Sequence, residues 1–136
     1  ICDARSHVCM YTIVAGVDTD TGRARRVAEE ITGLPIDDVH VILTHSFEKN
    51  PEGASIDQVG AARKARNLLE SHGIEVSFEE RSGNPATIVN AVADDADADL
   101  ICVAGRERSP AGKAVFGSVT QDVILNTDRP VLVCGN

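Results

Sequence analysis

One segment of the sequence combines glycines, cations and a predicted helix start in a pattern that suits phosphate binding. It spans residues 105–118 and opens with Gly105, a residue type that lets the backbone turn sharply or approach a ligand closely. It closes with Gly117 and Ser118 at the start of a predicted helix, where bare N–H groups and the positive dipole end attract anions. Three cations lie between these ends of an otherwise acidic chain: Arg106, Arg108 and Lys113. The alternative is a solvated loop with ordinary turn glycines and Ser118 as a helix cap.

A shorter segment, Thr19-Asp-Thr-Gly-Arg-Ala24, places two threonines beside a glycine. It is similar to the phosphate loop of flavodoxins, with Ala24 where that loop has its last hydroxyl. An FMN protein is therefore a remote alternative, although flavins stack on aromatic side chains and the chain has only three Phe, one Tyr and no Trp. The ordinary interpretation makes Thr21 the N-cap of a helix, with Gly22 in its first turn.

The sequence carries no recognisable catalytic motif. Its four histidines have no matching nucleophile, neither Ser109 nor Ser118 stands in a nucleophile elbow, and there is no Gly-x-x-x-x-Gly-Lys-Ser/Thr loop. Cys2, His7 and Cys9 are a weak set of metal ligands. The acidic run over residues 94–99 is typical of a solvated helix end. We expect no metal site, and at most weak ATP hydrolysis.

Apolar runs alternate with amphipathic stretches along the whole chain, which predicts βαβ units and a parallel sheet. Strands are predicted at residues 11–17, 39–45, 74–80, 100–104 and 131–134. Helices are predicted at residues 21–31, 55–72, 85–93 and 118–125, with Asn84 as the N-cap of the third and Gly73 ending the second. We expect one α/β domain, residues 10–136, preceded by a nine-residue extension from an upstream start codon or a cloning remnant.

Five strands and four helices in alternation give an open doubly wound parallel sheet, because crossover connections are right-handed. With the first and fourth strands central, the strand order is 3-2-1-4-5 and the sheet is Rossmann-like. Ligands of such sheets bind outside the carboxyl ends of the strands, where the strand order reverses. The residues after the first and fourth strands, 16–21 and 105–118, are therefore the expected site.

The composition limits the partners. A net charge of −8 argues against nucleic acid, which needs a basic surface, and no apolar run approaches the roughly 20 residues of a membrane span. We expect a soluble cytoplasmic protein. The chain has three lysines but is rich in aspartate, as in the salt-loaded cytoplasm of halophiles, where salt screens the repulsion between carboxylates. Cys102 and Cys134 lie in apolar strand patterns and are expected to be free, buried thiols.

Several stretches together resemble the universal stress protein family. They are Ile13-Val-Ala-Gly-Val-Asp18, Val41-Ile-Leu-Thr-His45, Ser82-Gly-Asn-Pro85, Asp99-Leu-Ile-Cys-Val-Ala-Gly-Arg, Phe116-Gly-Ser-Val-Thr-Gln-Asp-Val-Ile and Arg129-Pro-Val-Leu-Val. The similarity covers residues 10–136. It implies the strand order given above, a homodimer formed through the last strand from Val131 to Cys134, and a stress-response module that binds ATP or another adenine nucleotide, with Mg²⁺ as a candidate companion. The alternative within the family is a dimeric interaction protein that binds no nucleotide.

The resemblance also implies positions for the nucleotide site. Asp18 matches the acid near the adenine or ribose, Gly16 and Val17 offer backbone contacts, and Ser46 lines the pocket. The full set is Gly16, Val17, Asp18, Ser46, Ala104, Gly105, Arg106, Arg108, Gly117, Ser118 and Val119. The family's loop has a second glycine three residues after the first, then nine residues before Gly-Ser. Here Arg108 takes that glycine's position and eight residues follow, so the loop is shorter and more charged.

Overall fold

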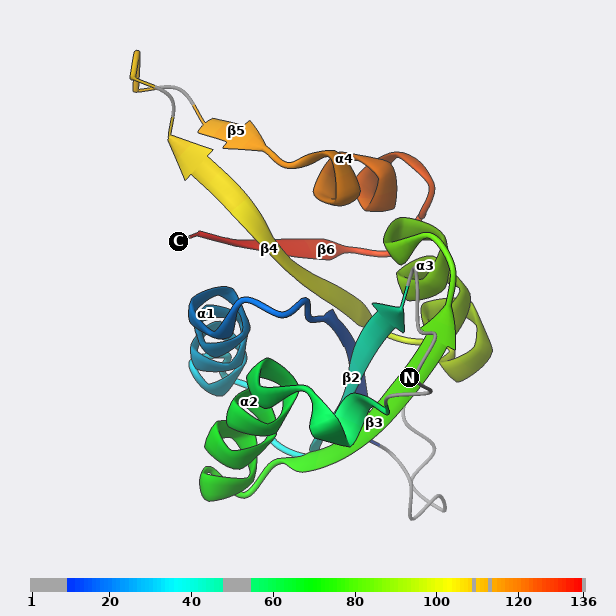
Figure 1. Ribbon diagram of the computed structural model, residues 1–136. Helices are drawn as coiled ribbons and strands as arrows, with labels where there is room; N and C mark the ends of the chain where they lie inside the picture. Colours follow the sequence, from blue (N-terminus) through cyan, green and yellow to red (C-terminus); the bar gives the residue numbers. More distant parts are fainter. Residues whose placement is uncertain (1–9, 48–54, 109, 113, 136) are drawn as a thin grey trace.

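The structure is a computed structural model that describes residues 10–47, 55–108, 110–112 and 114–135. The predicted extension, residues 1–9, lies outside the described residues. The strands are β1 (Tyr11–Gly16), β2 (Val39–Phe47), β3 (Glu75–Ser82), β4 (Leu100–Arg108), β5 (Ala114–Phe116) and β6 (Val131–Gly135). The helices are α1 (Thr21–Thr32), α2 (Gly60–Ser71), α3 (Pro85–Ala96) and α4 (Ser118–Leu125), with a short 3₁₀ turn, η1 (Ile56–Gln58), before α2 (Figure 1).

The five parallel strands run in the order β3-β2-β1-β4-β6, which confirms the predicted order. β1 and β4 lie at the centre of the sheet. Next to their pairing, the Asp99 amide donates to Thr12 O at 2.8 Å and the Thr12 amide donates to Asp99 Oδ2 at 2.9 Å, across 87 residues of sequence. This central pair sets the switch point at which the carboxyl ends of β1 and β4 diverge.

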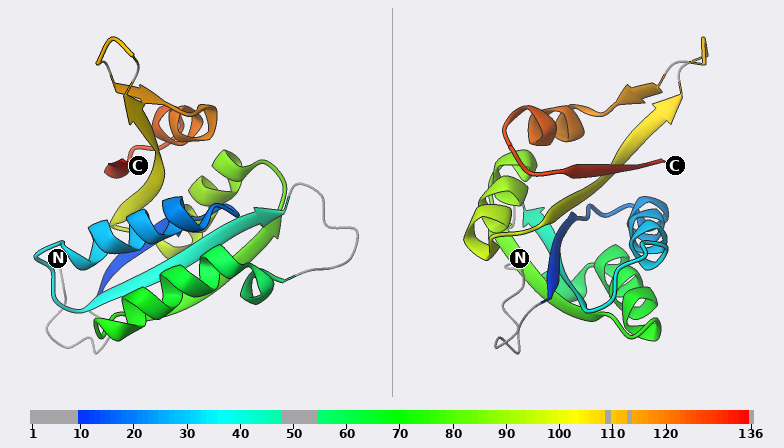
Figure 2. Two further views of the ribbon diagram at one scale, coloured as in Figure 1. Left: turned by 60° about the vertical axis from the view of Figure 1, so that its left-hand side comes forward. Right: turned by 180° about the vertical axis from the view of Figure 1, so that it is seen from behind.

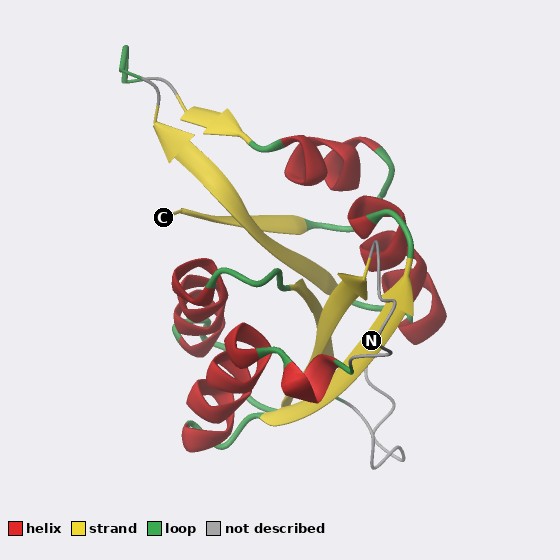
Figure 3. Ribbon diagram, in the orientation of Figure 1, coloured by secondary structure: helices red, strands yellow, loops and turns green. Residues whose placement is uncertain are grey.

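Helices cover both faces of the sheet, and Figure 3 shows them outside the strands on either side. On one face, α1 and α2 bury small and branched side chains such as Ala28, Ile31 and Leu69 against Ile13 and Leu43. On the other face, α3 and α4 pack Val89, Val92 and Val123 on Val14 and Ile101. The helical periodicity of the apolar residues predicted the buried stripes of α1 and α2, and each residue named here is at most 5% exposed.

Two helix ends follow the predictions and one corrects them. Asn84 is the N-cap of α3 and accepts the Thr87 amide at 3.2 Å, and Gly73 follows the end of α2 with a φ of +76°. The N-cap of α1 is Asp20, which accepts the Arg23 amide at 2.8 Å, so the prediction of Thr21 as the cap was wrong. Both residues have capping side chains, and with Asp20 as the cap the helix begins at Thr21, one residue earlier than a Thr21 cap implies.

The predicted second helix, 55–72, is two elements. Val59 has an extended backbone, with φ −82° and ψ 113°, and separates η1 from α2. A β-branched residue followed by Gly60 is a poor continuation of a helix, which explains the break.

The segment after Ala104 also differs from the prediction of a loop, because β4 continues to Arg108 and turns back as β5. Their antiparallel register pairs Arg106 with Phe116 and Arg108 with Ala114. β4 extends beyond the end of its neighbour β1, so the backbone N–H and C=O groups of its last residues need other hydrogen-bond partners. β5 provides them. The resulting hairpin projects from the body of the molecule, as Figure 2 shows from two sides.

Among the described residues, no helix combines the length and apolarity needed to cross a membrane. Cys102 and Cys134 are buried thiols outside any disulfide, as predicted, and burial raises the pKa of the Cys102 thiol above its ordinary value.

Candidate functional site

A cavity of about 450 Å³ lies at the carboxyl ends of β1 and β4, the predicted switch point. Its lining comes from β1 and β2, the starts of α1 and α3, the end of β4, and the segment from β5 into α4. Nine of the predicted site residues line it: Gly16, Val17, Asp18, Ser46, Ala104, Gly105, Gly117, Ser118 and Val119. Segments almost 90 residues apart in sequence are thus brought to one cavity because parallel strands end at the same edge of the sheet.

The backbones of Arg106 and Arg108 belong to β4, and their side chains lie outside the described part of the structure. Their predicted contact with phosphate therefore stays a prediction. The same holds for Lys113 and for the weak metal set of Cys2, His7 and Cys9, which lie outside the described residues.

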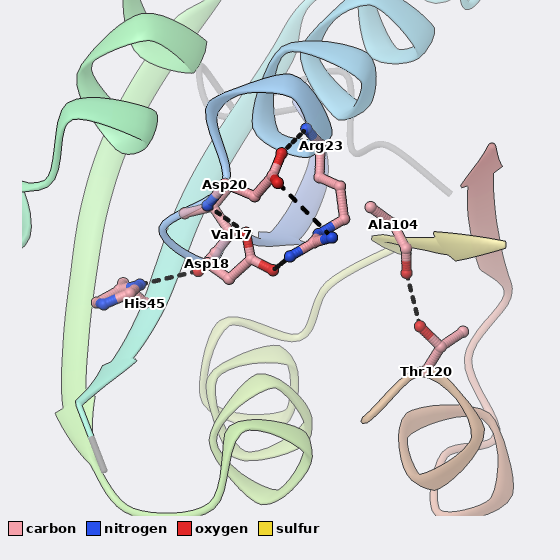
Figure 4. Close-up of polar contacts among 7 residues, drawn as sticks. All are labelled: Val17, Asp18, Asp20, Arg23, His45, Ala104 and Thr120. Carbon is pink, nitrogen blue, oxygen red and sulfur yellow. Dashed lines mark hydrogen bonds and ion pairs between the residues drawn. The ribbon is translucent and has the colours of Figure 1, made fainter. Parts of the chain in front are cut away.

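Asp18 anchors the β1 side of the cavity through both of its carboxylate oxygens. Oδ1 accepts the Asp20 amide at 2.8 Å, the side-chain turn expected for Asp after a strand. Oδ2 accepts Arg23 Nε at 3.0 Å and lies 2.9 Å from Arg23 Nη2 (Figure 4). The Asp18 carboxylate is therefore fixed in direction by the first turn of α1.

The backbone next to Asp18 is held just as firmly. The Val17 amide donates to Thr44 O at 2.9 Å, and the ring nitrogen Nδ1 of the buried His45 lies 2.9 Å from Val17 O. Ser46 hydrogen-bonds to Gly83 O, which ties the end of β2 to the turn before α3. The β1 side of the cavity is therefore held in place by protein contacts before any ligand binds.

The opposite side of the cavity depends on a close approach between β4 and α4. Gly105 has a φ of +106°, and a Cβ there would lie 2.8 Å from Thr120 Oγ1. Thr120 in turn donates to Ala104 O at 2.6 Å, and the Gly117 amide donates to Gly105 O at 3.0 Å. Gly105 is thus required by its backbone conformation and by the packing of α4. The helix cap is Gly117, so the alternative of Ser118 as the cap is wrong.

Sequence reasoning missed half of the lining. Nine further residues line the cavity: Arg23, Ala24, Thr44, Pro85, Val89, Val103, Val115, Phe116 and Thr120. Some of them lie in elements that the sequence predicted. Pro85 and Val89 belong to the helix that Asn84 caps, and Thr44 lies on the second predicted strand. Val115 and Phe116 lie within the expected segment 105–118, but the strand β5 that contains them was not predicted.

The arrangement has apolar walls and polar ends. Val89, Val103, Val115 and Phe116 offer apolar surface for a flat ring, while Asp18, Arg23 and the hydroxyls of Ser46 and Ser118 supply polar contacts. Phosphate at the start of α1, as in the flavodoxin alternative, would face the carboxylates of Asp18 and Asp20.

No cluster of three metal-ligating side chains occurs within the described ranges. The acidic run near the end of α3 is engaged in other contacts, as expected for a solvated helix end. Asp94 and Asp97 pair with Arg129, Asp95 pairs with Arg81 at 2.7 Å, and Asp99 accepts the Thr12 amide.

Comparison with known proteins shows similarity to one family. The model of the "Universal stress protein family" matches residues 10–135. A curated universal stress protein of Synechocystis is 32% identical over 120 residues, which is 81% of this chain and 76% of the relative. The chain spans 43% and 62% of the lengths of two further curated relatives, from Methanocaldococcus jannaschii and Mycolicibacterium smegmatis.

Solved structures show the same fold. A universal stress protein from Archaeoglobus fulgidus is 33% identical with a TM-score of 0.68, over 90% of this chain and 97% of that one. A universal stress protein of the same organism in complex with dAMP is 27% identical with a TM-score of 0.66, over 93% of this chain and 98% of that one. The predicted resemblance is confirmed: this chain belongs to the universal stress protein family.

Proposed function

We propose that this protein binds an adenine nucleotide, AMP or ATP, in the cavity at the carboxyl ends of β1 and β4. It would act in the cytoplasm as a stress-response module and not primarily as an enzyme. The observation that carries the proposal is the gathering of nine predicted binding positions on one cavity. A relative of 27% identity, solved in complex with dAMP, supports the choice of an adenine nucleotide.

The cavity suits the nucleotide in parts. The apolar side chains of Val89, Val103 and Phe116 would contact the base. The cavity's volume of about 450 Å³ falls in the range of small-molecule sites. The first turn of α4, from Ser118, offers N–H groups to phosphate, and Gly117 just before it leaves room for close approach.

The residues that the cavity presents do not suit a protein-bound Mg²⁺ ion. Asp18 is the one carboxylate among the described lining residues, and both of its oxygens already accept hydrogen bonds. A magnesium ion would therefore be held by the nucleotide's own phosphates and water.

The nucleotide would act by shifting the populations of the protein's conformations. Bound between β1 and α4, it favours arrangements in which the hairpin β4–β5 and α4 lie against it, and so changes the surface offered to a partner.

We include a homodimer through β6 in this proposal, because β6 is an outer strand of uncharged residues whose Val131, Leu132 and Val133 are only half-buried. Sedimentation velocity tests the dimer, and a monomer at micromolar concentration contradicts it.

Equilibrium dialysis with AMP and ATP in high potassium chloride tests the site. An added Cβ at Gly117 meets no atom within 4 Å, so Gly117→Val should fold normally and fill the space that phosphate needs. Gly60→Val is the matched control, because Gly60 is exposed at the start of α2 and does not line the cavity. We expect wild type and Gly60→Val to bind alike, and Gly117→Val to lose about tenfold or more in affinity, the scale of one lost charge-assisted contact.

Wild-type protein that binds neither nucleotide contradicts the proposed function. Equal binding by Gly117→Val contradicts the placement of phosphate at α4. In the first case the second candidate, a dimeric interaction protein that binds no nucleotide, gains support. The exposed apolar side chains of Val119, Ile124 and Leu125 on α4 favour that candidate.

A further inference from the structure

Arg23 is a charged residue of the cavity that sequence reasoning did not single out. It lies in the first turn of α1, and its side chain lines the cavity. Figure 4 shows it reaching from α1 into the gap between Asp18 and the Ala104–Thr120 contact. The guanidinium is held there by Asp18 Oδ2, 3.0 Å from Nε and 2.9 Å from Nη2, and Asp20 Oδ2 lies 3.7 Å from Nη1. Two carboxylates thus direct one guanidinium toward the switch point.

The position of Arg23 determines the net charge of the cavity. Among the described lining residues, Asp18 and Arg23 are the charged side chains, so their charges cancel at the cavity. The chain as a whole carries −8, which by itself repels an anion. Without Arg23, the Asp18 carboxylate would face any phosphate group in the cavity with no described cation beside it, and like charges in a partly desolvated site repel strongly.

We propose that Arg23 is the charge-selecting residue of the cavity: it gives the site its preference for a phosphorylated nucleoside over the uncharged nucleoside. This inference rests on the proposed function and extends it to the class of ligand. Arg23 acts by neutralising the Asp18 carboxylate, which would otherwise repel a phosphate group bound in the same cavity. Its planar fork keeps the positive charge in place while it stays bound to Asp18.

The ratio of two affinities isolates this role from the shape of the cavity. AMP and adenosine share the base and the ribose and differ in the phosphate group. A change that only disturbs packing lowers both affinities, and a change in charge alters the ratio of the adenosine Kd to the AMP Kd. Both constants are measured by isothermal titration calorimetry at 50 and 500 mM potassium chloride.

Three variants of α1 and one of the segment after β1 make the test specific. Arg23→Gln removes the charge and Arg23→Lys keeps it without the fork. Arg25→Gln is the matched control, because Arg25 lies on the same helix, pairs with Glu29 at 2.8 Å and does not line the cavity. Asp18→Asn removes the opposing charge.

We expect the wild type to prefer AMP, and Arg23→Gln to lower the ratio about tenfold, the scale of one charge-assisted contact. Arg23→Lys and Arg25→Gln should keep most of the ratio, and Asp18→Asn should raise it. Added salt should raise the ratio of Arg23→Gln, because it screens the repulsion from the unopposed Asp18 carboxylate, and should change the wild-type ratio less.

An unchanged ratio in Arg23→Gln, or equal losses for AMP and adenosine, overturns the role of Arg23 while the nucleotide site stands. Equal wild-type affinity for the two ligands does the same. If the wild type binds neither ligand, the proposed function fails, and this inference fails with it.

Discussion

The two sides of the cavity are built in different ways. On the β1 side, the polar groups of Val17, Asp18 and Arg23 are bonded to protein partners, and the exposed surface is polar. On the α4 side, two hydrogen bonds to Gly105 O and Ala104 O join α4 to the sheet. There Val115 (45%), Phe116 (38%) and Val119 (41%) expose large fractions of apolar side chain. One side is shaped before any ligand arrives, and the other has apolar surface that a ligand can bury.

This difference assigns separate tasks to the two sides. The β1 side can set selectivity, because its charges are fixed in direction before binding. The α4 side can respond, because it gains most contact area when the cavity fills.

The largest effect is expected from Gly105→Ala, which attacks the junction on the α4 side. The φ of +106° strains any side chain, and the new Cβ would lie 2.8 Å from Thr120 Oγ1. We expect the free energy of unfolding in urea to fall by about 2–3 kcal/mol. Gly33→Ala is the control, because Gly33 has a φ of −84° and ordinary contacts, and it should change stability by less than about 1 kcal/mol. Similar losses in the two variants would show that Gly105 is not conformationally required.

The next effect concerns the buried part of β4 beneath the cavity. Burial raises the pKa of the Cys102 thiol above its ordinary value of 9.0, so at higher pH the unfolded chain loses this proton and the folded chain keeps it. The contribution to stability is complete below pH 9 and declines above it. We expect this thiol to lower the free energy of unfolding by up to about 1.4 kcal/mol per pH unit. Urea titrations from pH 8 to 10 should show a shallower decline in Cys102→Ala, and equal slopes would contradict the assignment.

A smaller effect tests the β1 side. Asp20→Ala removes the N-cap of α1, which accepts the Arg23 amide at 2.8 Å, and should cost about 1 kcal/mol. Thr21→Ala is the matched control at the neighbouring position that the sequence suggested as the cap. Thermal unfolding should distinguish them, with Thr21→Ala close to wild type. A larger loss in Thr21→Ala would restore the sequence-based assignment.

The smallest effect is on exchange rates. The Val17 amide is bonded to Thr44 O, whereas Ser118 and Val119 stand in the first turn of α4, where amides lack intrahelical acceptors. We expect saturating AMP to slow hydrogen exchange at Ser118 and Val119 and to leave Val17 unchanged. Protection confined to Val17 would reverse the roles assigned to the two sides.

Sequence reasoning identified part of each side of the cavity and missed the rest for physical reasons. Alternation of strands and helices fixed the strand order, and local signals such as Asn84-Pro85 placed α3. The bounds of α4 were also predicted, at residues 118–125. The extension of β4 and the strand β5 were missed because Arg106-Glu-Arg108 has no apolar pattern, and its strand conformation comes from pairing with Ala114–Phe116. Arg23 was missed because a helical residue reaches the cavity only through its pairing with Asp18.

The hydrogen bonds that join Thr12 to Asp99 have a consequence for the order of events in folding. Thr12 and Asp99 lie 87 residues apart, so pairing of the two central strands closes a long loop, and we expect it to form later than the contacts between β2 and β3. The cavity is complete only when this pairing is in place. A nucleotide would therefore have no site in the early ensemble, and it would prolong the lifetime of the folded chain by slowing unfolding while leaving the rate of folding almost unchanged.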